Sequence, residues 1–352
     1  EKRMQKHGGN VYRQHYRMDY SVNVNPLGTP ESVMAAACEG IRHSAQYPDV
    51  DCGALREKLA KAERVEGNQL IFGNGAADLI FSLALAMKPK TVLLPAPTFA
   101  EYEQAVKIVE SRVIHHDLTE AEGFVLDGRL LEKITPEVDM VFLCNPNNPT
   151  GLPVGKRLMA EILEKCAACQ AILVVDECFN EFLDRPGDYS MKEYLNRYPN
   201  LFILKAFTKV YAMAGLRLGY GLCADQELLA RMREVNQPWN VSIPAQYAGV
   251  AALDETAYVK RCKDMLSGER DYLKEQLEQL GFRVFDSQAN YIFFHAWPEL
   301  WQEMADRGIL IRDCSNFAGL EAGYFRIAVK THEENKELIN TMKEVIKWQR
   351  QS

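Results

Sequence analysis

Between residues 31 and 235, short apolar runs alternate with stretches whose apolar residues recur at helical spacing. Runs such as 140–144 and 171–176 are continuously apolar, which is typical of strands covered on both faces. This alternation predicts βαβ crossovers, and hence an α/β fold with a mainly parallel sheet whose ligands bind beyond the carboxyl ends of its strands. The predicted strands are 91–95, 140–144, 171–176, 201–205 and 218–223, and the predicted helices are 53–65, 76–87, 99–109, 155–168 and 225–235.

The pattern changes after Trp239 to long charged helices, 257–280 and 332–349, with short strands between them. This change favours an α+β unit of its own. The first 30 residues are rich in Asn, Gly, Pro and His, which predicts an extended arm with turns. We therefore expect three parts: a large domain of residues 31–235, a smaller domain of residues 236–352, and an arm of residues 1–30 that joins the smaller domain.

Composition excludes several classes of partner. The chain has 41 Lys and Arg against 48 Asp and Glu, a net charge of −7, so it lacks the basic field that nucleic acid or an anionic membrane requires. No stretch is long and apolar enough to span a bilayer. Most of the nine cysteines lie in apolar runs, which indicates reduced thiols and a cytoplasmic protein. The lone pair Cys166 and Cys169 has no further ligands at metal-binding spacing, so we expect no metal site.

The stretch LKAFTKVYAMAGLRLGYG, residues 204–221, carries the most chemical information. Lys209 follows a strand end and is suited to form an imine with an aldehyde, while Thr208 and Arg217 are suited to hold a dianion. The alternative is that Lys209 and Arg217 are solvated surface charges. Lys205 is a rival attachment point, but it lacks the spacing to Arg217.

Two further strand ends carry polar groups. Asp176 ends the apolar run 171–176, where a carboxylate can pair with a protonated ring nitrogen and keep it cationic. The alternative is a helix N-cap. Asn148, in CNPNNPTG (144–151), can donate a hydrogen bond to a phenolate oxygen, although the same string also reads as a plain turn.

Two more motifs complete the pattern. FGNGAADLIFSL (72–83) places a glycine turn before a helix, and the free N–H groups of a helix N-terminus suit a phosphate. A dinucleotide fingerprint is the alternative, but the third glycine is missing. Phe99, in PAPTFAEY (95–102), follows a strand end and can stack on a flat cofactor or serve as a core aromatic.

Taken together and in this order, the five motifs resemble the fold-type I, class II aminotransferase family over nearly the whole chain. The resemblance implies the aspartate-aminotransferase fold, a seven-stranded-type sheet sandwiched by helices with a smaller α+β C-terminal domain. It also implies pyridoxal 5'-phosphate as cofactor and a homodimer with shared active sites. The implied cofactor residues are Lys209 as Schiff-base lysine, Asp176 at the ring nitrogen, Asn148 at the 3-oxygen, Phe99 and Phe179 beside the ring, and Thr208, Arg217, Asn74, Gly75, Ala76 and the partner's Tyr47 at the phosphate.

The resemblance extends to the substrate residues. Arg326 corresponds to the arginine that binds the substrate's anionic group, and Arg312 to a second basic residue found where substrates carry phosphate. The HGGN string resembles an arm that folds over a substrate phosphate. The full set of expected substrate residues is His7, Gly8, Gly9, Asn10, Asn25, Asn148, Asn290, Arg312, Arg326 and Lys330.

Within the family, the sequence is most similar to the L-threonine-O-3-phosphate decarboxylases and the histidinol-phosphate aminotransferases. Phe179 stands where the aminotransferases usually have Tyr, HGGN resembles the decarboxylase arm, and Lys330 adds positive charge. These features favour a decarboxylase that forms (R)-1-amino-2-propanol phosphate for cobalamin synthesis. The alternatives are a histidinol-phosphate or related phospho-amino-acid aminotransferase, a non-catalytic regulatory module of the same fold, and a nicotinamide dehydrogenase. The chain lacks the helix-turn-helix pattern that such a regulatory module would carry. It also lacks the dinucleotide fingerprint that a dehydrogenase would need.

Overall fold

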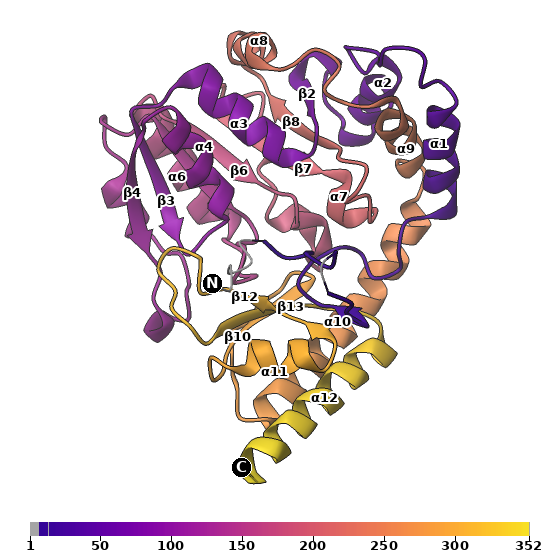
Figure 1. The fold of residues 1–352 in the computed structure, drawn as a ribbon. Helices are drawn as coiled ribbons and strands as arrows, with labels where there is room; N and C mark the ends of the chain where they lie inside the picture. Colours follow the sequence, from indigo (N-terminus) through magenta and orange to yellow (C-terminus); the bar gives the residue numbers. More distant parts are fainter. Residues whose placement is uncertain (1–6, 13, 352) are drawn as a thin grey trace.

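The computed structural model describes residues 7–12 and 14–351, and a seven-stranded sheet forms its centre (Figure 1). The strand order is β2-β8-β7-β6-β5-β3-β4. Strands β7, β6, β5, β3 and β4 run parallel, whereas β8 is antiparallel to both of its neighbours. The strands are β2 (Leu70–Gly73), β3 (Thr91–Ala96), β4 (Arg112–Asp117), β5 (Met140–Cys144), β6 (Ile172–Asp176), β7 (Leu201–Ala206) and β8 (Gly219–Cys223).

Helices cover both faces of this sheet, because the inner strands are mostly apolar and are buried along nearly their whole length. Successive residues of β5 alternate between two cores: Phe142 packs with helices α3, α4 and α8, and Val141 packs with α2, α6 and α9. The period of two along a strand produces this division. The helices are α1 (Glu31–Ile41), α2 (Gly53–Glu63), α3 (Ala76–Met87), α4 (Ala100–Ile108), α5 (Leu130–Lys133), α6 (Lys156–Ala168), α7 (Phe207–Val210), α8 (Gln226–Val235) and α9 (Ile243–Ala252).

A smaller antiparallel sheet, in the order β12-β13-β10-β9, packs against α10, α11 and α12 below the large sheet (Figure 1). Its strands are β9 (Arg283–Val284), β10 (Tyr291–His295), β12 (Arg312–Asp313) and β13 (Tyr324–Ala328). The helices are α10 (Thr256–Gln279), α11 (Leu300–Asp306) and α12 (His332–Gln351). The α/β fold with a smaller α+β part, expected from the sequence, is confirmed.

The N-terminal segment runs between the large and small sheets (Figure 1). Its strand β1 (Met18–Asp19) pairs in parallel with β11 (Ile309–Leu310), and the Asn25 N–H donates to the Lys209 carbonyl at 2.9 Å. The arm therefore contacts both parts of the molecule. The described residues also form five short 3-10 turns: η1 (Gly67–Gln69), η2 (Glu120–Glu122), η3 (Asn180–Phe182), η4 (Pro186–Asp188) and η5 (Lys192–Tyr194).

The division into domains at residue 235 stays a prediction. The predicted boundary places Val241, Ala245 and Ala248 in the smaller domain, but these residues lie in the core on one face of the large sheet. Within the described residues, no helix is long and apolar enough to cross a membrane, and no group of three or more His, Cys, Asp or Glu is arranged to hold a metal ion.

Candidate active site

A cavity of about 340 Å³ opens at the carboxyl ends of β5, β6 and β7. Cys144, Asp176 and Ala206 are the last residues of these three strands, and all three line it. The other lining residues come from the arm, from α3, α4 and α7, from the small sheet, and from the loops that follow β3, β5, β6, α7 and β12. They are His7, Gly8, Ser21, Val22, Asn23, Ala76, Ala77, Phe99, Ala100, Glu101, Asn148, Cys178, Phe179, Thr208, Lys209, Arg217, Arg312, Phe317 and Arg326.

Lys209 lies in the short helix α7, directly after β7, and its side chain lines the cavity. Burial lowers the pKa of its amine to about 8, and the positive charges of Arg326 and Arg217 act in the same direction. A neutral amine is the nucleophilic form. The Nζ lies 5.8 Å from the centre of the Phe179 ring.

Asp176 is buried at the end of β6. Its Oδ2 accepts a hydrogen bond from the Tyr102 hydroxyl at 2.6 Å, and its Oδ1 accepts one from the Cys178 backbone N–H at 2.9 Å. Burial raises the pKa of the carboxyl, whereas the hydrogen bonds oppose that rise. A cation placed against this carboxylate would therefore be stabilised strongly.

The N-terminus of α3 and Arg217 form one end of the cavity. Ala76 and Ala77 in the first turn line it together with Arg217 and Thr208. Gly75 precedes the helix with φ +79°, and a Cβ added there would lie 2.3 Å from Arg217 Nη2. Because of this close approach, Gly75 is required for the Arg217 guanidinium to reach the helix N-terminus.

Two arginines of the small sheet also line the cavity. Arg312 on β12 and Arg326 on β13 are direct cross-strand partners, so their side chains share one face of the sheet. Arg326 donates through Nη1 to Asn148 Oδ1 and through Nη2 to the Ser21 carbonyl at 2.9 Å. Burial lowers the pKa of Arg326 to about 10. Buried positive charge of this kind indicates an anionic ligand.

Phe99 and Phe179 lie on the cavity wall. Phe99 is half-buried and contacts Tyr102 edge-on, with ring centres 5.5 Å apart. Phe179 contacts Tyr291 edge-on at 5.0 Å. No hydroxyl is present at position 179, so the side chain there can pack but cannot donate a hydrogen bond.

Several expected residues lie outside the cavity wall. Asn25 is buried, and its amide donates to the Val210 carbonyl while its Oδ1 accepts from the Leu27 N–H, so both groups hold the backbone. Asn290 donates to the Asn23 carbonyl. Gly9 donates its N–H to Ser21 Oγ, and Lys330 pairs with Glu334 at 3.1 Å. The expected residues that do not line the cavity are Gly9, Asn10, Asn25, Tyr47, Asn74, Gly75, Asn290 and Lys330.

Other lining residues were not expected from the sequence. Asn23 lines the cavity in place of Asn25, and its buried Oδ1 has no hydrogen-bond partner among the described residues. Glu101, on the first turn of α4, adds a carboxylate. Tyr102 does not line the cavity, but it holds Asp176.

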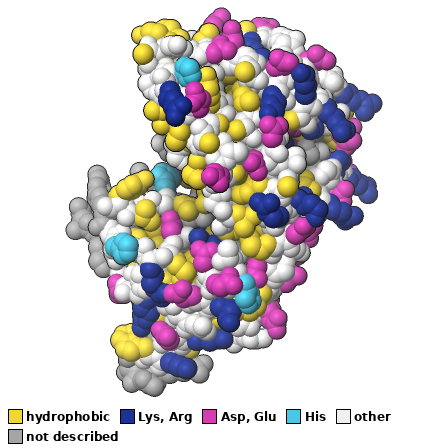
Figure 2. Space-filling view, turned by 90° about the vertical axis from the view of Figure 1, so that its right-hand side faces the viewer, with side chains coloured by type: hydrophobic (Ala, Val, Ile, Leu, Met, Phe, Trp, Pro, Cys, Tyr) yellow, Lys and Arg dark blue, Asp and Glu magenta, His cyan; other side chains and the backbone are white. Residues whose placement is uncertain are grey.

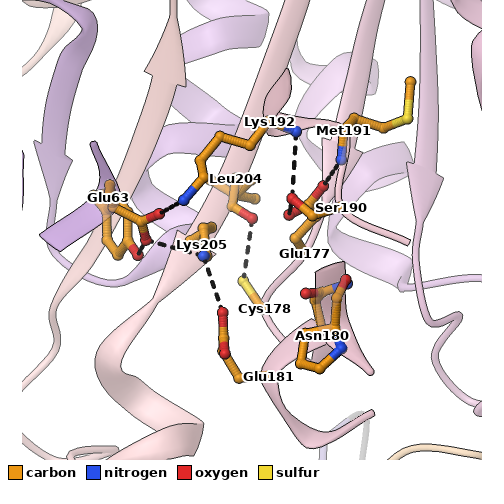
Figure 3. A network of polar contacts seen from close by, with 12 residues as sticks. Glu63, Glu177, Cys178, Asn180, Glu181, Ser190, Met191, Lys192, Leu204 and Lys205 are labelled. Carbon is orange, nitrogen blue, oxygen red and sulfur yellow. Dashed lines mark hydrogen bonds and ion pairs between the residues drawn. The ribbon is translucent and has the colours of Figure 1, made fainter. Parts of the chain in front are cut away.

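Lys205, the rival attachment point, is outside this cavity. Its Nζ pairs with Glu63 at 2.9 Å and with Glu181 at 3.3 Å in a buried network, and Lys192 also pairs with Glu63 (Figure 3). Burial lowers the pKa of Lys205, but Tyr220 and the carboxylates outweigh burial and raise that pKa well above its usual range. A permanently charged amine is a poor nucleophile, so the structure favours Lys209 over Lys205.

Comparisons with known proteins all point to one family. Residues 17–342 match the model of aminotransferase class I and II. The threonine-phosphate decarboxylase of Salmonella typhimurium is 34% identical over 333 residues, which cover 94% of this chain and 91% of that protein. The histidinol-phosphate aminotransferase of Methanosphaera stadtmanae is 30% identical, with 92% of this chain and 89% of that protein covered.

Solved structures agree with the sequence comparisons. The histidinol-phosphate aminotransferase of Clostridium acetobutylicum superposes with a TM-score of 0.87 and 31% identity, covering 93% of this chain and 98% of that one. The L-threonine-O-3-phosphate decarboxylase of Porphyromonas gingivalis superposes with a TM-score of 0.82 and 25% identity, covering 93% and 99%. The chain therefore belongs to the aminotransferase class I and II family, and pyridoxal 5'-phosphate is its cofactor.

Proposed function

We propose that this protein is an L-threonine-O-3-phosphate decarboxylase that forms (R)-1-amino-2-propanol phosphate for cobalamin synthesis. The observation that carries the proposal is the position of His7 and Gly8, which line the same cavity as Arg312 and Arg326. We infer that these four residues form the substrate end of the site. The 34% identity to the Salmonella decarboxylase and the Phe at position 179 support the same activity.

The cavity residues fit pyridoxal 5'-phosphate. The phosphate would be held by the α3 N-terminus, the Thr208 hydroxyl and Arg217, since free N–H groups and a guanidinium bind dianions well. Phe99 would supply a flat surface for the ring, and Asn148, whose Oδ1 already accepts from Arg326, would use its amide N–H toward the 3-oxygen. Lys209 would hold the aldehyde carbon through Nζ.

Bound pyridoxal 5'-phosphate supplies a cationic ring that accepts the electron pair left on the substrate Cα when a bond to that carbon breaks. Asp176 keeps the ring nitrogen protonated, because a buried carboxylate strongly favours a cation beside it. Tyr102 fixes the orientation of Asp176 through the 2.6 Å hydrogen bond. These two residues therefore set how strongly electrons are withdrawn.

The substrate has two anionic groups, and the small sheet offers two arginines. Arg312 and His7 would bind the phosphate, and Arg326 would orient the carboxylate so that the bond from Cα to the carboxylate carbon breaks. Asn23 Oδ1, a buried acceptor without a partner, would receive an N–H of the substrate. After carbon dioxide leaves, the Lys209 amine is placed to deliver a proton to Cα.

Phe179 is the residue that separates this proposal from the runner-up activity, histidinol-phosphate aminotransferase. A Tyr at that position would give the cofactor 3-oxygen a second hydrogen bond. Without it the oxygen is more basic, which changes the protonation of the bound cofactor. The runner-up remains worth testing because the Clostridium aminotransferase is structurally very similar.

The decisive assay uses the purified holoenzyme with three substrates. With L-threonine phosphate we expect carbon dioxide and an amino-alcohol phosphate, without any added 2-oxo acid. With serine phosphate we expect slower release, and with histidinol phosphate plus 2-oxoglutarate we expect little turnover. Rapid transamination of histidinol phosphate, together with no carbon dioxide from L-threonine phosphate, would overturn the proposal.

We also propose a homodimer in the cytoplasm. Large apolar side chains of α1, α9 and the neighbouring loops are exposed on one side of the molecule, and Figure 2 shows hydrophobic side chains across that side. Tyr47 is 77% exposed and stacks on Trp239 at 4.4 Å, outside its own cavity. This position suits a residue that is offered to a partner's site. The exposed apolar residues are Met34, Ile41, Tyr47, Val50, Trp239 and Tyr247.

A further inference from the structure

Glu101 is a carboxylate in the substrate end of the cavity, and the chemistry above gives it no role. It lines the cavity together with Arg312 and Lys209, and its side chain is 13% exposed. Burial raises the pKa of its carboxyl. A carboxylate so placed offers a phosphorylated substrate no attractive contact of its own. Its presence there therefore calls for another function.

The partner of Glu101 is His7 of the arm. His7 Nδ1 lies 3.0 Å from Glu101 Oε1, although the two residues are far apart in the sequence. With Nδ1 engaged by the carboxylate, Nε2 is the ring atom left to contact a ligand. Glu101 thus fixes both the position of the arm and the orientation of the imidazole ring.

The residues after His7 continue this attachment. Gly8 packs so closely on Ser21 that a Cβ at position 8 would lie 2.3 Å from the Ser21 carbonyl oxygen. Gly9 donates its N–H to Ser21 Oγ at 2.8 Å. The Ser21 carbonyl in turn accepts from Arg326 at 2.9 Å. Residues 7–9, which we name the strap, are therefore fastened to Glu101 on one side and to the Arg326 network on the other.

We propose that Glu101 is a positioning residue that holds the strap across the substrate end of the cavity by binding His7. This inference rests on the proposed function only for the identity of the substrate. Glu101 acts through His7, so its loss should weaken substrate binding more than it slows the chemical step.

The test compares Glu101→Gln with Glu103→Gln in the holoenzyme. Glu103 lies on the same helix and also pairs with a histidine, His115, at 2.9 Å, but it does not line the cavity. The first measurement is amide hydrogen exchange of the segment that contains Gly8 and Gly9. We expect exchange about two- to five-fold faster in Glu101→Gln and unchanged in Glu103→Gln, because loss of a part-exposed ion pair shifts an equilibrium by a few-fold. Unchanged exchange in Glu101→Gln would overturn the strap attachment whatever the substrate is.

The second measurement is steady-state kinetics with L-threonine phosphate. We expect KM to rise about 2- to 5-fold in Glu101→Gln while kcat changes less than about two-fold. His7→Ala should raise KM at least as much, and the double variant should match His7→Ala alone because Glu101 acts through His7. Additive effects, or an unchanged KM despite faster exchange, would contradict the positioning role. If the wild-type enzyme releases no carbon dioxide but the exchange result holds, the proposed function fails and the strap attachment stands.

Discussion

The Tyr102 hydroxyl lies 2.6 Å from Asp176 Oδ2, and the Tyr102 ring stacks on Phe142 with centres 4.9 Å apart. Tyr102 comes from α4 and Asp176 from the end of β6. A helix on one face of the sheet therefore orients a carboxylate at the carboxyl end of a central strand. The aspartate itself is expected from the sequence. Its orienting partner is visible only in the folded structure.

Tyr102→Phe tests this relationship. The ring and its stacking on Phe142 are kept, so we expect a folded protein. Loss of one hydrogen bond to a buried carboxylate should lower kcat about 5- to 10-fold. Steady-state kinetics would measure the change, with Tyr324→Phe as control because the Tyr324 hydroxyl contacts Glu120 away from the cavity. Equal effects of the two substitutions would argue against a role for Tyr102 at Asp176.

Arg312→Gln tests the phosphate-binding end. Arg312 lies on β12 beside Arg326, and we expect its loss to raise KM for L-threonine phosphate about 10- to 100-fold. Arg283→Gln is the matched control, since Arg283 is on the same sheet but pairs with Glu120 outside the cavity. The KM for the unphosphorylated amino acid should change little. A similar loss for both substrates would show that Arg312 does not distinguish the phosphate.

The buried network of Figure 3 predicts a pH-dependent contribution to stability. The pKa of Glu63 is lowered to about 2: burial alone would raise it, and Lys205 and Lys192 outweigh burial. A carboxyl whose folded pKa is depressed stabilises the protein above its unfolded pKa, and this contribution is lost as pH falls toward the folded pKa. By linkage Glu63 contributes about 3 kcal/mol at pH 7, of which about 2 kcal/mol is lost by pH 3.

Glu63→Gln checks this contribution. Urea unfolding should show the variant less stable than wild type by about 2 to 3 kcal/mol at pH 7, and the difference should shrink on acidification. Glu57→Gln, at an exposed pair with Lys61, should be nearly neutral at both pH values. A difference between Glu63→Gln and wild type that does not depend on pH would contradict the assigned pKa.

Much of the fold and of the site could be predicted because residues with ionisable side chains stand at or just after the ends of apolar strands. Asp176 ends β6, and Lys209 follows β7, so strand ends marked both positions. Strands β2 and β4 were not predicted. They are the two edge strands of the large sheet. The sequence RVIHHD of β4 is partly polar because this edge strand is less buried than the inner strands.

Other site residues could not be predicted from the sequence, for a different reason. Asn23 and Asn25 lie in one irregular string, NVNPLG, and no periodicity indicates which of them faces the cavity. Glu101 and Tyr102 lie on an ordinary amphipathic helix, where a glutamate reads as a solvated charge. Their roles depend on contacts with His7 and Asp176 across long sequence separations. Such contacts are set by packing and cannot be predicted from local pattern.

The lowered pKa of the Lys209 amine predicts how cofactor uptake depends on pH. Its pKa is lowered from 10.5 to about 8, so about one amine in ten is neutral at pH 7, and the fraction rises through pH 8. The rate at which the cofactor-free protein takes up pyridoxal 5'-phosphate should rise accordingly and level off above about pH 9. Absorbance of the bound cofactor measures this rate. A rate that keeps rising toward pH 10.5 would indicate an amine with an ordinary pKa.

The most direct test of the account is to find which lysine carries the cofactor. The holoenzyme is reduced with borohydride, digested with trypsin and analysed by mass spectrometry. Because a modified lysine is not cleaved, attachment at Lys209 predicts a labelled peptide of residues 206–217, from the Lys205 cut to Arg217. A label on the peptide of residues 198–209 would place the cofactor on Lys205 and contradict the assignment, as would a protein that takes up no cofactor.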